Sequence, residues 1–159
     1  MKYILLIFFF FFVAKASSLE LKCNFEEVYK DGSTQLGLLL IKDAKLRYQY
    51  LDKNLFTIFK KNLDFYYVEN RNTETFKKIN DNTAVLKNIS EIFEKYPNIE
   101  NIYHQDDLKF LIEKSEETNF LKRISVQSPK VNLSIYFRDC EEIIVQDKYL
   151  SFFPLNEYN

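Results

Sequence analysis

The chain contains few of the residues that mark turns and metal sites. Its 159 residues include two glycines, three prolines, one histidine, two cysteines and no tryptophan. Most zinc and other transition-metal sites combine several His or Cys ligands, so one imidazole argues against such a site. The pair Asp31-Gly32 is the single Asp-Gly or Asn-Gly dipeptide, which is typical of a tight hairpin turn. We therefore expect no metal ion and a hairpin at this position.

Catalytic motifs are also missing. The sequence has no GxSxG, phosphate-binding loop, HExxH or CxxC pattern. Its one histidine, His104, is expected in a solvated loop beside Asp106-Asp107, and Glu116-Glu117 stands where another turn belongs. The sequence thus predicts no catalytic residue and no cofactor, and it favours a protein that is not an enzyme.

A short apolar run opens the chain. Lys2 is followed by ten apolar residues, Ile4 to Val13, and then by Ala14-Lys15-Ala16, which has the A-x-A form of a cleavage site. Ten helical residues span about 15 Å, half of the roughly 30 Å hydrocarbon core of a bilayer. We expect residues 1–16 to be a secretory signal peptide; the alternative is an uncleaved anchor.

Residues 17–159 then have the length of one domain. Without Lys2 and Lys15 they carry 20 basic and 23 acidic side chains, a net charge of −3, so no nucleic-acid partner is expected. Cys23 and Cys140 form an even pair, which in an oxidising compartment makes them disulfide candidates. Two buried free thiols are the alternative.

Alternating apolar and polar residues predict a protein made mainly of strands. In KLRYQYL (45–51), Leu46, Tyr48 and Tyr50 alternate with polar neighbours, as in a strand with one buried face. Short connections favour antiparallel neighbours. Strands are expected at residues 19–29, 34–42, 45–51, 55–61, 63–70, 74–80, 107–114, 119–127, 130–139, 141–146 and 149–155.

One helix is expected, from Thr83 to Tyr96. Apolar residues recur at helical spacing from Val85 to Tyr96, Pro97 stops the helix, and Asp81, Asn82 or Thr83 can cap its start. About ten strands with one principal helix predict a curved antiparallel sheet, or an incomplete β-barrel, around that helix. The inward-facing aromatics then either fill a core or line a space for an apolar ligand.

A family resemblance favours the second interpretation. The stretch from Gly37 to Ile89 begins GLLLIKDAKLRYQYL and continues through LDFYYVEN to TAVLKNI, and the chain ends YLSFFPLNEYN. This order of motifs resembles the LolA family of periplasmic lipoprotein carriers, in which a turn leads into a strand with the pattern hydrophobic-R-W-x-Y. Leu46, Arg47, Tyr48 and Tyr50 stand at those four positions.

The resemblance implies an incomplete barrel whose apolar cavity takes the acyl chains of lipoproteins. An inner-membrane ABC transporter would release the cargo, and an outer-membrane receptor would accept it from a monomeric carrier in the periplasm. Arg47 is the family-motif arginine. The predicted lipid-cavity residues are Leu39, Ile41, Leu46, Tyr48, Tyr50, Phe56, Ile58, Phe65, Tyr67, Ile89 and Phe93.

The chain also departs from the family. Asp43-Ala44 replaces the family's Arg-Pro-Gly turn, and the arginine linked to holding the lid closed has no counterpart, Lys42 being the nearest basic residue. The family's first amphipathic helix is replaced by Ser17 and Ser18 before strand-like sequence. The alternative to a carrier is a secreted, disulfide-linked β interaction module with a filled core and no lipid ligand.

Overall fold

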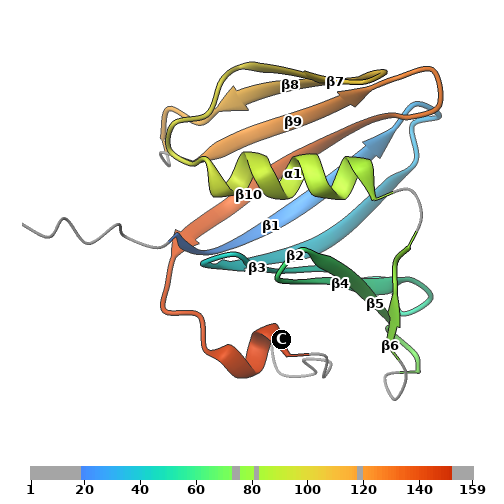
Figure 1. Cartoon of the computed structure of the whole chain (residues 1–159), viewed down its shortest axis with the longest axis vertical. Coiled ribbons are helices and arrows are strands. Elements are labelled where there is room, and N and C mark those ends of the chain that lie inside the picture. The colour runs from blue at the N-terminus through green and yellow to red at the C-terminus, as the bar shows by residue number, and fades with distance from the viewer. Residues whose placement is uncertain (1–18, 73–75, 81–82, 118–119, 152–159) are drawn as a thin grey trace, which may run out of the picture.

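The computed structural model describes residues 19–72, 76–80, 83–117 and 120–151. They form one sheet of ten antiparallel strands and one α-helix, α1, which lies across the concave face of the sheet (Figure 1). The predicted curved sheet around a helix is therefore confirmed. The strands are β1 (Glu20–Tyr29), β2 (Thr34–Lys42), β3 (Lys45–Tyr50), β4 (Phe56–Lys61), β5 (Asp64–Glu69), β6 (Phe76–Lys78), β7 (Ile102–Gln105), β8 (Leu108–Lys114), β9 (Leu121–Gln127) and β10 (Asn132–Glu142).

The strand order is β6-β5-β4-β3-β2-β1-β10-β9-β8-β7, so the sheet consists of two meanders joined along β1 and β10. Few residues separate the neighbouring strands of each meander in the sequence. The first turn is the predicted one, where Gly32 takes a φ of 83° and the Ser33 amide donates to the Asp31 carboxylate. α1 (Ala84–Glu94) belongs to the connection between the two edge strands, β6 and β7. Between these two edge strands, the chain crosses the inner face of the sheet as α1 (Figure 1).

The disulfide between Cys23 and Cys140 joins β1 to β10. The bond lies where the register between these two strands shifts, since Cys23 stands between Lys22 and Asn24, the residues on either side of the shift. The bonded residues are 117 positions apart in the chain. Closing so long a loop stabilises a fold by about 4 to 5 kcal/mol in the chain-entropy account. The disulfide therefore reinforces the one strand pair that depends on long-range contact.

Three predictions of local structure were wrong. His104 lies in strand β7, not in a loop, and Asp106-Asp107 forms the turn to β8. The expected strand at 141–146 does not form, because Glu141 and Glu142 end β10 and the next four residues are irregular. The expected strand at 149–155 begins inside a 3₁₀ helix, η1 (Asp147–Leu150), and its residues from 152 on lie outside the described part of the chain.

Of the three residues predicted to cap the start of α1, the structure describes one. Thr83 is the N-cap residue, but its side chain makes no capping hydrogen bond; Asp81 and Asn82 lie outside the described residues. The expected signal peptide, residues 1–16, lies outside them too. Among the residues that the structure describes, no helix is long and apolar enough to cross a membrane.

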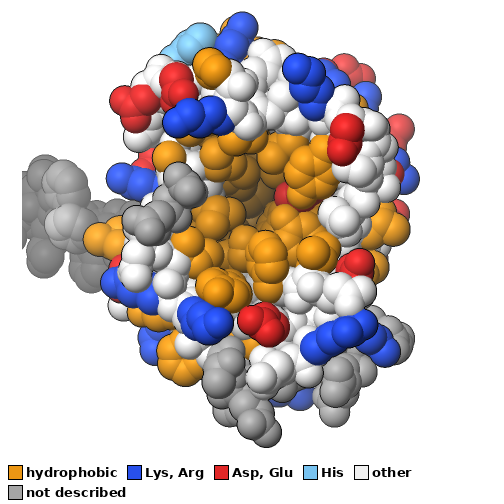
Figure 2. Space-filling view, turned by 90° about the vertical axis from the view of Figure 1, so that its right-hand side faces the viewer, with side chains coloured by type: hydrophobic (Ala, Val, Ile, Leu, Met, Phe, Trp, Pro, Cys, Tyr) orange, Lys and Arg blue, Asp and Glu red, His pale blue; other side chains and the backbone are white. Residues whose placement is uncertain are grey.

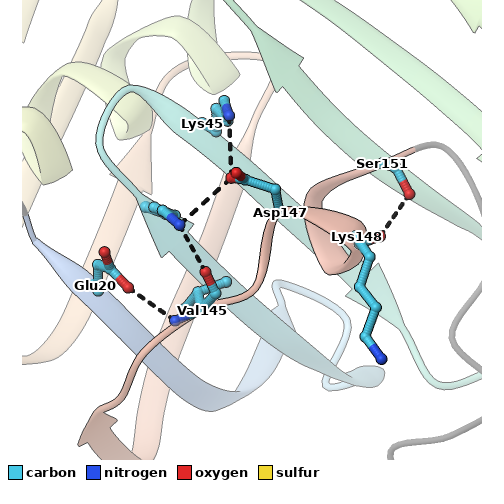
Figure 3. A network of polar contacts seen from close by, with 7 residues as sticks. Glu20, Lys45, Val145, Asp147, Lys148 and Ser151 are labelled. Carbon is cyan, nitrogen blue, oxygen red and sulfur yellow. Dashed lines mark hydrogen bonds and ion pairs between the residues drawn. The ribbon is translucent and has the colours of Figure 1, made fainter.

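The segment after β10 covers the convex face of the sheet. Val145 packs on Leu38 and Leu40, which point outward from β2. Lys42 donates to the Val145 carbonyl at 2.9 Å. The Val145 amide donates to Glu20 at 2.8 Å (Figure 3). Lys45 lies 3.2 Å from the Asp147 carboxylate in the same view. Lys42 thus holds this outer segment.

Candidate functional site

The space between α1 and the sheet is filled at the end where the helix finishes. The rings of Phe93, Phe120 and Phe137 lie 5.8 to 6.1 Å apart, and Tyr96 packs on Phe120 at 5.4 Å. Ring pairs at these distances are the packing of an ordinary aromatic core. We call this region the filled end.

An ion pair also fixes α1 at the filled end. Lys60 points inward from β4, is 8 % exposed and pairs with Glu94 in the last turn of the helix. Glu94 is 42 % exposed, so the pair is screened on one side and contributes on the order of 1 kcal/mol at most. The apolar contacts of Ile89, Ile92 and Phe93 therefore hold the helix more strongly than this ion pair does.

The other end, under the first turns of α1, is hollow. A cavity of about 150 Å³ lies between the helix and the strands, with walls that are mainly apolar. We call it the hollow end, and a hollow lined with hydrophobic side chains opens on the corresponding face of the molecule, with charged residues around its rim (Figure 2). The cavity is lined by Glu27, Tyr29, Leu46, Tyr48, Tyr50, Phe65, Val85, Leu86, Ile89, Leu133 and Ile135.

Two larger pockets adjoin this cavity and lead to the surface. One of about 350 Å³ shares Tyr29 and Tyr50 with it and continues over Leu55 and Phe56. The other, of about 580 Å³, shares Tyr29 and Leu133. The shared residues place both pockets directly beside the cavity. An elongated apolar molecule can therefore lie partly in the cavity and partly in its mouth.

A buried carboxylate lies in the wall of the cavity. Glu27 is only 5 % exposed, because it occupies an inward position between Phe25 and Tyr29 on β1. It accepts hydrogen bonds from the hydroxyls of Tyr48 at 2.7 Å, of Tyr50 at 3.0 and 3.1 Å, and of Tyr29. We call these four residues the Glu27–tyrosine cluster.

The three phenols stay protonated over the physiological range. Burial is the main cause that raises the pKa of Tyr29 above its ordinary value, and the hydrogen bond to the Glu27 carboxylate and repulsion from its charge raise it further. Burial is also the main cause that raises the pKa of Tyr48 and of Tyr50 well above the ordinary value of 10.0, and the negative charge of Glu27 is the second cause. The hydroxyl hydrogens are therefore permanently available to Glu27.

The absence of a side chain at Gly37 shapes the same region. A Cβ there would lie 1.9 Å from the Phe25 ring and 2.4 Å from the Gln49 carbonyl oxygen. The Phe25 ring thus lies directly over β2 and stacks on Tyr48, with 3.9 Å between ring centroids. The same Tyr48 side chain donates its hydroxyl hydrogen to Glu27.

The structure divides the predicted lipid-cavity residues into three sets. Leu46, Tyr48, Tyr50, Phe65 and Ile89 line the cavity, and Phe56 lines its mouth. Tyr67 lies beside Phe56, with 5.9 Å between their rings. Buried in the core without lining the cavity are Leu39, Ile41, Ile58 and Phe93.

Arg47 lies on the opposite face of the sheet from the cavity. Its side chain is fully buried, with the guanidinium 5.2 Å from the centre of the Phe59 ring. It donates to the Tyr149 carbonyl at 2.9 Å and to Gln49 at 3.1 Å. Arg47, which the resemblance aligned with a family arginine, therefore anchors the outer C-terminal segment.

Sequence reasoning missed Glu27, Tyr29, Leu133, Ile135 and the helix residues Val85 and Leu86 as parts of the cavity wall. A signal for Glu27 was present, because it interrupts the run of apolar residues at alternate positions of β1. A carboxylate in the buried phase of a strand needs hydrogen-bond donors nearby. Tyr29 comes from the same strand, but Tyr48 and Tyr50 come from β3, about twenty residues further along the chain.

Comparisons with known proteins add nothing to this geometry: no protein-family model matches the chain, and no curated protein was found to be similar to it. Within the described residues, no group of three or more His, Cys, Asp or Glu side chains is placed to hold a metal ion. The candidate site is consequently defined by the cavity, its mouth and the Glu27–tyrosine cluster.

Proposed function

We propose that the protein is a periplasmic carrier that binds the acyl chains of lipoproteins, or a related lipid, in the groove beneath α1. The observation that supports this function is the apolar cavity under the first turns of the helix, with a second pocket directly beside it that shares Tyr29 and Tyr50. The disulfide is compatible with an exported protein. Transfer between an inner-membrane release complex and an outer-membrane receptor is part of the same proposal.

The size of the cavity defines how such a carrier works. An apolar cavity of about 150 Å³ in another protein holds a single benzene ring, so here only the end of an acyl chain enters while α1 stays in place. A longer chain requires the helix to move away from the sheet. Uncovering Ile89, Ile92 and Phe93 costs about 5 to 9 kcal/mol, and burying ten methylenes gains about 8 kcal/mol. Cargo can therefore offset displacement of the helix.

The first test is to purify the protein from its own envelope and identify bound molecules by native mass spectrometry and lipid extraction. We expect acylated protein or lipid in near-stoichiometric amount. The purified apo protein is then titrated with the neutral fluorescent probe N-phenylnaphthylamine, which should bind with enhanced fluorescence and be displaced by lipid. A protein that carries nothing and leaves the probe in water would contradict the carrier function.

The second candidate is an interaction module that uses a sheet edge. Both edge strands present an apolar side chain to solvent, Phe76 on β6 at 54 % exposure and Ile102 on β7 at 48 %. Unpaired edges bind added strands. Replacement of either residue by Lys should abolish partner binding in that case and leave probe binding unchanged, whereas a carrier loses probe binding only when the cavity is altered.

A further inference from the structure

The hollow end combines an apolar cavity with a group that only accepts hydrogen bonds. The carboxylate of Glu27 has about four lone-pair positions, and three phenol hydrogens are directed at it. Because each phenol uses its one hydrogen on Glu27, its oxygen presents only lone pairs to the cavity. The cluster therefore carries one negative charge and has no free donor to offer a ligand.

The buried Glu27 carboxylate lies near the boundary between the cavity and its mouth. Tyr29 and Tyr50 line both the cavity and the adjoining pocket of about 350 Å³, and Glu27 lies behind them. Asp31 lines that mouth pocket as a second carboxylate. The aromatic faces of Tyr50 and Phe56, 5.3 Å apart, border the same space. Carboxylates and aromatic faces both attract a cation.

We infer that the Glu27–tyrosine cluster recognises the head of a cationic amphiphile, an ammonium group bearing N–H donors, while the attached chain occupies the apolar cavity. The inference rests on the proposed function and names the class of ligand for the same groove. An ammonium supplies donors to the remaining lone pairs of Glu27 and of the phenols, and it neutralises the buried charge. A carboxylate head supplies neither and is repelled.

The lysines near the groove lie on its other side. Lys30 and Lys130 line the pocket of about 580 Å³ together with Asp31, and neither lines the cavity. They are therefore placed to meet an anionic group farther out along a ligand. The preference at the inner position is set by Glu27, which is almost fully buried and so little screened by solvent.

The test compares three soluble ligands that have the same chain: octylammonium, octanol and octanoate. Displacement of N-phenylnaphthylamine at neutral pH gives their affinities for the full disulfide-bonded protein. We expect octylammonium to bind tightest, octanol next and octanoate weakest, with at least about a tenfold difference between the charged pair. Equal affinities, or tighter binding of octanoate, would overturn the inference and leave the carrier function intact. If the probe itself does not bind, the carrier function fails first.

Two variants locate the preference. Glu27→Gln removes the charge and should lower octylammonium affinity about tenfold, with a smaller effect on octanol. Glu26→Gln is the matched control, because Glu26 faces outward on the same strand and pairs with Arg138 at 2.6 Å; it should change nothing. Should Glu27→Gln fail to fold, Tyr29→Phe tests the same point: it frees a carboxylate lone pair, so the preference for ammonium over carboxylate must persist or grow. A preference lost in Tyr29→Phe, or unchanged in folded Glu27→Gln, would contradict the inference.

Discussion

At the end of α1, Phe93 meets Phe120 and Phe137, and the three rings pack together between helix and sheet. At the beginning of α1, Val85 and Leu86 face Leu133 and Ile135 across a cavity. The same helix and the same sheet form both ends. The comparison teaches that side-chain size along one helix decides where this fold is a core and where it is a binding site.

Removing the disulfide should have the largest effect on stability, because it secures the filled end across 117 residues of chain. We expect the double variant Cys23→Ala/Cys140→Ala to lose about 4 to 5 kcal/mol of unfolding free energy. Urea denaturation followed by circular dichroism measures the loss. A decrease below about 1 kcal/mol would mean that β1 and β10 pair equally well without the bond.

Truncating an aromatic at the filled end should come next. Phe120 is 2 % exposed, so Phe120→Ala is expected to cost about 3 to 4 kcal/mol through lost transfer energy and a new cavity. Leu86→Ala at the hollow end is the matched comparison. Because Leu86 already borders empty space and is partly exposed, it should cost only about 1 kcal/mol. Similar costs in urea denaturation would remove the distinction between the two ends.

High pH should act on the hollow end through its phenols. Burial and Glu27 raise the pKa of Tyr48 and Tyr50 above 10.0, so the folded state binds protons more tightly than the unfolded state does. The resulting stability is complete below pH 10.0 and is lost as the pH rises toward the raised folded pKa values. Ultraviolet absorbance should show these phenols ionising together with unfolding. In Tyr50→Phe the decline with pH should be shallower; an unchanged slope would contradict this origin.

Filling the cavity should separate binding from stability, with the smallest effect on folding. Val85→Phe places a ring in the hollow end, so we expect no loss of stability, or a gain of about 1 kcal/mol, and at least about a tenfold loss of N-phenylnaphthylamine affinity. Lys87→Phe is the control, since Lys87 lies on the solvent side of the same helix. Unchanged probe binding in Val85→Phe would show that the probe binds elsewhere.

Much of this architecture was readable from local patterns. Leu46, Tyr48 and Tyr50 face inward because a strand alternates its side chains, and this holds before any partner strand is known. The stripe from Val85 to Phe93 placed the apolar face of α1 in the same way. The two cysteines made a disulfide between Cys23 and Cys140 a candidate, and the structure confirms the bond. Strand β7 was not predicted, because it is a short edge strand without a buried face. Ile102 and His104, on one of its faces, are both exposed, so no alternation of apolar and polar residues marks it.

The sequence by itself therefore determined the helix, most of the strands and which of their residues face inward, because those properties repeat over neighbouring positions. Only the tertiary structure decided that Arg47 lies under the C-terminal segment and that Glu27 meets three phenols. It alone also decided that the space beneath α1 is closed at one end and open at the other. These features depend on strands and a helix distant in the chain being brought to van der Waals distance, and no local period encodes the volume left between them.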